Sequence, residues 1–220
     1  MGIIDLQHYL VSTFTACIHA AQAEMTVIND LFENFSATER QAIFGYLAET
    51  TVTSDLSLRD ENRRNLYVIP SYPVVGVPFP QIGVYLPGEE MQDFPMGQSS
   101  GAEPTPVMDG AQIVGWRQEY MAVSAISYRA DIFCNTPEET VWLSRLCQRA
   151  LFSKVLALDA MGVKEPRISM ADLRLEQEHF PSQVFARGIS LSAKAFHTWH
   201  ETIPAYTGTS IVSNPALKGG

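Results

Sequence analysis

The feature that most constrains the fold is an abrupt change of hydrophobic periodicity near residue 135. Between Tyr120 and Cys134 apolar residues occupy alternate positions, which predicts a long β-strand with one buried face. From Pro137 to Met161 the apolar residues recur every three or four positions, which predicts a long α-helix. A long central strand is therefore expected to lead directly into a long helix.

The residues at both ends of this helix have the chemistry of helix caps. The Thr136 hydroxyl can accept a hydrogen bond from a free amide of the first turn, and Pro137 has no amide hydrogen to leave unpaired there. The two carboxylates that follow, at residues 138 and 139, favour the positive end of the helix dipole. Gly162 suits a left-handed residue just after the helix.

Cys134 lies at this junction and raises the question of an active site. No basic residue stands beside it, and the nearest histidine in the following sequence is His179. We therefore interpret Cys134 as a small core residue. A helix N-terminus supplies some of the polarisation that a thiolate needs, so a reactive cysteine is the alternative.

The remaining pattern predicts helices before the long strand and a strand pair after the long helix. Apolar stripes and a capping box from Ser36 to Glu39 indicate helices in residues 1–50, the last one ending near Glu49. Alternation predicts strands at residues 81–86, 167–175 and 184–196. We expect an α+β fold with a mixed or antiparallel sheet flanked by helices, one long helix after a long central strand, and a long irregular loop.

Eight of the 13 prolines fall between Pro70 and Pro106, which excludes regular helix there and limits strands to short or edge pieces. The Pro- and Gly-rich segment 87–115 is expected to be the long loop, ordered only against a partner from about residue 89 to 110. Residues 1–204 are expected to form a single domain, followed by a C-terminal tail at 205–220.

Composition narrows the function classes. A net charge of −9 with only 15 basic residues disfavours tight binding to a phosphate backbone. Charged residues make up 18% of the chain, below the usual share of about 25%, which is typical of surfaces that assemble with other proteins. Three cysteines at unrelated spacings indicate neither a disulfide framework nor a metal site, and no apolar run is long enough to cross a bilayer. We expect a soluble protein in a reducing compartment.

Motifs for catalysis or cofactor binding are missing from the sequence. It has no Gly-rich phosphate loop and no GxSxG nucleophile elbow. His197 and His200 would point to opposite faces of a strand, so we expect no metal site. The carboxylates of Glu89, Glu90 and Asp93 are interpreted as a solvated acidic patch in the loop, with a role at an interface. We expect no catalytic, cofactor-binding or metal-binding residues.

Trp116 and Arg117 stand at the start of the long strand. They are either an isolated amphipathic anchor or a hot spot of an interface, because Trp and Arg are enriched at such positions.

Several segments together cover most of residues 30 to 196: residues 39–47, residues 79–90 with Met96 and Gly97, the strand 120–134 with the helix start at 136–140, and residues 169–173, 180–181 and 185–191. In these segments and in the order of its elements, the chain resembles the tail terminator, or neck, proteins of tailed bacteriophages.

This resemblance implies a structural virion protein of the tail or neck, assembled in the host cytoplasm. Its subunits form a hexameric ring that ends the tail tube at the head-proximal end and provides a surface for head–tail joining. Its implied partners are copies of itself, the tail tube protein, a sheath protein where one is present, and connector or adaptor proteins on the head side. DNA would pass through the lumen without specific binding. No catalysis, cofactor or membrane is implied.

Two other functions remain open. One is a different connector or head-completion adaptor, which the same composition allows. The other is a small enzyme with an unrecognised site, which a deep pocket uniting Cys134 with His179 or His197 would favour.

Overall fold

The computed structural model describes residues 6–74, 76–91, 103–173 and 184–204. By its contacts the chain divides into two compact units. The larger unit contains residues 1–92 and 123–196, and the smaller contains residues 93–122 and 197–220. The sequence did not indicate this division. The tail expected at 205–220 lies outside the described residues.

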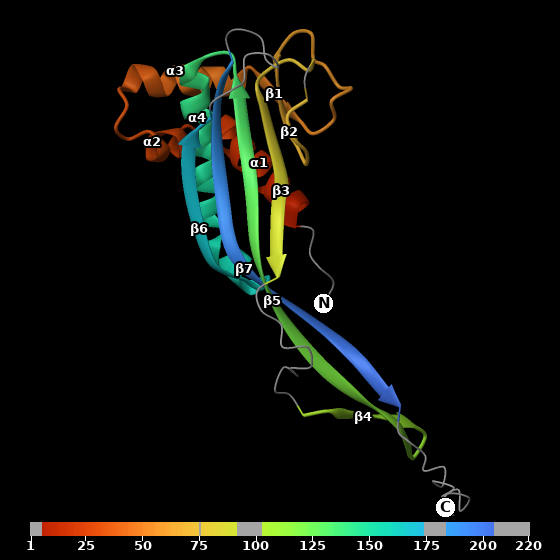
Figure 1. Ribbon diagram of the computed structural model, residues 1–220. Helices are drawn as coiled ribbons and strands as arrows, with labels where there is room; N and C mark the ends of the chain where they lie inside the picture. The colour runs from red at the N-terminus through yellow and green to blue at the C-terminus, as the bar shows by residue number, and fades with distance from the viewer. Residues whose placement is uncertain (1–5, 75, 92–102, 174–183, 205–220) are drawn as a thin grey trace, which may run out of the picture. The chain divides into compact units, whose positions relative to one another are not determined.

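The strands form a mixed sheet in the order β1-β2-β3-β5-β7-β6 (Figure 1). Neighbours β1 and β2 are parallel, as are β2 and β3, whereas β3 pairs with β5, and β6 with β7, in antiparallel fashion. The bounds are β1 Thr50–Thr53, β2 Arg64–Ile69, β3 Gln81–Met91, β5 Gln112–Cys134, β6 Val163–Asp172 and β7 Phe185–Pro204. Together with the helices, this sheet confirms the expected α+β class.

Helices cover one face of the sheet in the larger unit. They are α1 (Leu6–Ala23), α2 (Met25–Leu31), α3 (Ala37–Ala48), α4 (Pro137–Ser153) and α5 (Val155–Ala160). Helix α1 packs along α4 and also contacts α3, β2 and β3 (Figure 1). The hydrophobic core therefore lies between this helical layer and the sheet.

The alternation in β5 decides which side chains enter that core. Ala130, Ile132 and Cys134 are buried in it, together with Phe14 and Ile18 of α1. Burying a stripe of this kind is the main source of stability for a helix packed on a sheet. The intervening residues of β5 face the opposite side of the sheet.

The cap residues behave as their chemistry predicts. Ser36 and Glu39 form a reciprocal capping box at the start of α3. The Thr136 hydroxyl accepts from the Glu139 amide at the start of α4. Gly162 has φ of 86°, in the left-handed region that favours glycine.

The expected continuous helix 137–161 is wrong at one position, because the helix is interrupted at Lys154 between α4 and α5. The Ser153 hydroxyl donates to the Ala150 carbonyl, and the Lys154 amide bonds back three residues to Leu151. Such bonds tighten and bend a helix end. The apolar repeat continues past this point, so periodicity alone does not reveal the break.

The expected loop at residues 87–115 is also wrong in part. Strand β3 continues past Pro87 to Met91, with a shift of its register against β5 between Tyr85 and Gly88. A bulge of this kind accommodates a proline, which has no amide hydrogen for the ladder. Residues 105–109 form the further strand β4 (Thr105–Asp109), which pairs with the beginning of β5. Residues 92–102 lie outside the described part.

Candidate interaction surfaces and the strand–helix junction

Cys134 is fully buried at the junction of β5 and α4. Burial raises the pKa of the Cys134 thiol to about 12, although a hydrogen bond with Thr140 acts in the opposite direction. The thiol is therefore protonated at neutral pH and is not poised as a nucleophile. The structure bears out the placement of Cys134 in the core.

Two charged residues near this junction, Arg64 and Glu139, lie beside the aromatic rings of Tyr46 and Trp142. Arg64 lies 4.2 Å above the Tyr46 ring centroid, and its Nε is 3.9 Å from Oε1 of Glu139. Trp142 meets the same Tyr46 ring edge-on at 5.4 Å between centroids. Burial, followed by the charge of Glu139, raises the pKa of Tyr46. Cys134 lines neither the cleft along α4 nor the cleft at residues 48–49 and 61–64.

A second polar group lies on the sheet face opposite the helices. The Tyr85 hydroxyl donates to Oδ2 of Asp131 at 2.7 Å, and Nε of Arg129 donates to Oδ1 at 2.7 Å. Tyr72 stacks on Tyr85 with 3.8 Å between ring centroids. Burial, together with the hydrogen bond to Asp131, raises the pKa of Tyr85. Both oxygens of Asp131 thus have protein donors. Since Tyr85 belongs to β3 and Asp131 to β5, their hydrogen bond joins the two strands.

The smaller unit contains a β-hairpin whose surface is unusually apolar. Its strands, β4 and the beginning of β5, are joined by a tight turn at Gly110 and Ala111, where Gly110 has φ of 62°. Trp116 pairs with Pro106 across the hairpin and is 42% exposed, and Arg117 pairs with Thr105 and is also exposed.

Four large apolar side chains of this hairpin are exposed to solvent: Met108, Ile113, Val114 and Trp116. Cross-strand partners share a face, so Met108 and Ile113 lie on the same face of the hairpin as Pro106 and Trp116, and Val114 lies at the register shift between Val107 and Met108. Exposed apolar side chains that gather in this way are typical of surfaces that bind a partner. The hairpin, defined here as residues 105–117, is therefore a candidate interaction surface.

The acidic residues that the sequence singled out lie in a different segment of the chain. Glu89 and Glu90 lie in β3, opposite Ile126 and Ala125 of β5, and not in the expected loop. Asp93 falls outside the described residues. The side chains of Glu89 and Glu90 are likewise outside what the structure describes, so the acidic patch stays a prediction.

The structure describes the histidine pair only in part. His200 places Nδ1 at 3.9 Å from Oε2 of Glu119, within the smaller unit. The side chain of His197 and all of His179 lie outside what is described. In the described residues, no three His, Cys, Asp or Glu side chains gather as a metal site would require.

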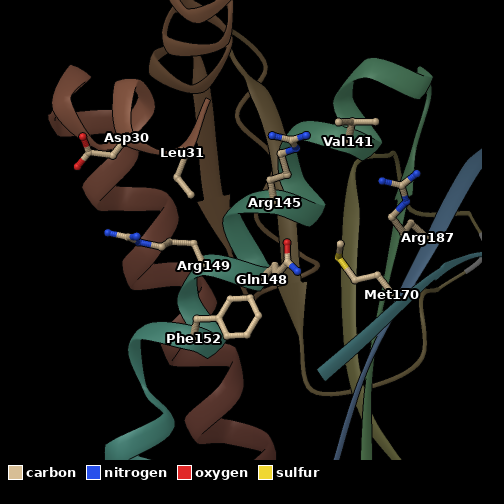
Figure 2. Close-up of a pocket in the computed structure, with 9 residues that line it drawn as sticks. All are labelled: Asp30, Leu31, Val141, Arg145, Gln148, Arg149, Phe152, Met170 and Arg187. Atoms are coloured by element: carbon tan, nitrogen blue, oxygen red, sulfur yellow. The ribbon is translucent and has the colours of Figure 1, made fainter. Parts of the chain in front are cut away.

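Sequence reasoning missed a groove in the larger unit. One stripe of α4, made of Val141, Arg145, Gln148, Arg149 and Phe152, forms one wall of a cleft of about 400 Å³. Figure 2 shows Met170 and Arg187 on the side of Gln148 and Phe152, and Asp30 and Leu31 on the side of Arg149. This cleft, called the α4 groove below, leaves one face of the helix uncovered.

The α4 groove combines free positive charge with exposed apolar side chains. Neither Arg145 nor Arg149 forms an ion pair with a carboxylate in the described part of the chain. Arg145 instead lies 5.2 Å from the Phe35 ring centroid, which supports its guanidinium from one side. Phe152 is 57% exposed, and Met170 is also exposed. The groove is therefore a second candidate interaction surface, suited to an acidic and apolar partner.

The groove could not be located from the sequence because its residues come from four distant segments. Its one local signal is Phe152, a large apolar residue that lies outside the buried stripe of α4. By contrast, Trp116 and Arg117 were identified from the sequence. Their exposure in the hairpin agrees with an interface role without testing it.

No protein-family model matches the chain, and no curated protein matches it. No helix in the described ranges is long and apolar enough to span a membrane.

Proposed function

We propose that the chain is a structural virion protein that ends the tail tube of a phage as a ring at its head-proximal end. The observation that carries this proposal is the exposed apolar hairpin with Met108, Ile113, Val114 and Trp116. A surface of this kind is stabilised when a partner covers it.

Two further properties support an assembly role. The chain is poor in charge and acidic, with 24 acidic and 15 basic residues. A ring with such a surface lets DNA pass without gripping it, because tight phosphate binding needs clustered basic residues. The resemblance in element order to tail terminator proteins supports the choice of the tail end over other assemblies.

The proposed ring has six subunits and contacts several proteins. A ring closes through heterologous contacts, in which each subunit uses two different patches. The hairpin and the α4 groove are two such patches on different units of the chain. The tail tube protein, a sheath protein where one is present, and head-side connectors are the further proposed partners.

The test is electron microscopy of the purified protein, alone and mixed with isolated tail tubes and with heads. Binding to the head-proximal end of tubes supports a terminator. Binding to heads but not to tubes would replace it with a head-completion adaptor. The enzyme alternative gains nothing from Cys134, whose burial and raised pKa disfavour a thiolate.

A further inference from the structure

The uncovered face of α4 carries positive charge on a chain that is acidic overall. Three arginines line the α4 groove against one carboxylate, Asp30. Arg187 is already engaged, since its Nε lies 2.7 Å from Oδ1 of Asp172. Arg145 and Arg149 are the guanidinium groups that remain for a carboxylate from outside. Because the chain has a net charge of −9, a second copy can supply such a carboxylate.

The tip of the hairpin has the complementary chemistry. Asp109 stands beside the turn, paired with Gln112, and forms no ion pair within the described ranges. The next pair along the hairpin is Met108 and Ile113, and both side chains are exposed. Successive pairs of a hairpin face opposite sides, so the tip offers a carboxylate on one face and two apolar side chains on the other, to a cleft that contains guanidinium groups and Phe152.

We propose that the hairpin tip of one copy, residues 108–113, docks in the α4 groove of a second copy. The Asp109 carboxylate then meets the guanidinium of Arg149, with Arg145 close by. Met108 and Ile113 cover the exposed side chains of Phe152 and Met170 of the second copy. This inference rests on the proposed ring and names the two patches that would join its neighbouring subunits.

A second copy is the occupant that these observations favour. Residues 103–122 of the smaller unit carry three carboxylates, those of Glu103, Asp109 and Glu119, against the single basic residue Arg117. The docking tip itself, residues 108–113, has Asp109 as its one charged residue, so the tip and the α4 groove have opposite charge. A cleft of about 400 Å³ is at the small end of the range for ligand sites and suits a few inserted side chains. Contact between two unlike patches also produces closed rings.

The test is a charge-swap cycle on the full chain, read by sedimentation velocity over a range of concentrations. Asp109→Arg and Arg149→Glu each place like charges together and should weaken self-association about tenfold or more. Combining both substitutions restores the opposite charges and should recover most of the lost affinity. Arg63→Glu, an exposed reversal outside the α4 groove, is the matched control and should change little. Thermal melts should be unchanged for all four variants, because each side chain is exposed.

Disulfide trapping tests the geometry independently of affinity. Chains with Asp109→Cys are mixed with chains with Arg149→Cys, and a dimer should form under mild oxidation only in the mixture. The inference would be overturned by two results together. A dilute chain that carries both substitutions would form the disulfide within itself, and the mixture of singly substituted chains would form no dimer. The hairpin would then reach the groove of its own chain.

Other results would also overturn it while leaving the proposed function to its own test. A chain that stays monomeric at every concentration, or self-association that ignores both reversals, would show that these patches do not meet. Binding of a free acidic peptide that Arg149→Glu abolishes, without any self-association, would assign the groove to a different partner. The proposed function fails separately, if tail tubes carry no ring of this protein.

Discussion

Cys134 should be almost unreactive toward thiol reagents in the folded protein. Its pKa of about 12 implies that about one thiol in ten thousand is ionised at pH 8, compared with roughly one in four for an ordinary thiol. Ionisation alone therefore slows alkylation by roughly a thousandfold. Full burial adds a further barrier, because the reagent must reach the sulfur through the core.

The assay is iodoacetamide labelling at pH 8, with peptide mapping by mass spectrometry to separate Cys134 from Cys17 and Cys147. Cys17 is partly exposed, whereas Cys147 is buried and serves as the internal control for core protection. We expect Cys17 to label first, and the two buried cysteines only after addition of denaturant. Labelling of Cys134 in the folded protein faster than Cys17 would refute the structural interpretation and revive the reactive one.

Substitution gives the corresponding energetic prediction. Cys134→Ala removes one buried sulfur atom and should lower the free energy of unfolding by about 1 kcal/mol, measured by chemical denaturation, without changing assembly. Loss of assembly in a variant that remains folded would contradict the assignment of Cys134 to the core.

Three further predictions concern the packing around the sheet. Asp131→Ala should lower the free energy of unfolding by about 2–3 kcal/mol, because it leaves the buried Tyr85 hydroxyl without an acceptor, and Tyr85→Phe should lower it by about 1 kcal/mol. A double-mutant cycle measured by urea denaturation tests this pair. Additive effects would show that the 2.7 Å hydrogen bond contributes nothing. Gly83→Ala should lower the free energy of unfolding by about 2 kcal/mol or more, because the added Cβ would lie 2.5 Å from the Ser71 carbonyl oxygen. Gly45→Ala, which has open space around it in α3, should raise the free energy of unfolding by about 0.5–1 kcal/mol. Equal melting temperatures for the two variants would argue against this packing. Burial raises the pKa of Tyr85 and of the buried thiols above their values in the unfolded chain. The unfolded chain therefore loses these protons first as the pH rises, so the free energy of unfolding should be constant up to about pH 8 and should fall as the pH rises toward 12. A melting temperature that does not change with alkaline pH would contradict this.

Local chemistry made the strand–helix junction predictable. The preferences of Thr136, Pro137 and Gly162 depend only on the few residues around each of them. In the structure Thr136 caps α4, Pro137 lies in its first turn, and Gly162 adopts a left-handed conformation. The interruption at Lys154 was not predictable in this way, because α5 continues the apolar repeat of α4.

Long-range features were harder to predict. Strand β4 lies in a segment rich in proline and glycine and is formed by pairing with β5, which a propensity argument does not include. The α4 groove depends on which helix face remains uncovered after packing, so Arg149 and Met170 could not be associated from the sequence. Trp116 was identifiable because a large aromatic residue beside an arginine is an interface signal wherever the strand lies.

The proposed role at the tail end is tested most directly by electron cryo-microscopy of tails assembled with the purified protein. We expect a sixfold ring of density at the head-proximal end of each tail tube, which is absent when the protein is omitted. Tails that bind no protein at that end, or that end normally without it, would contradict the proposed role.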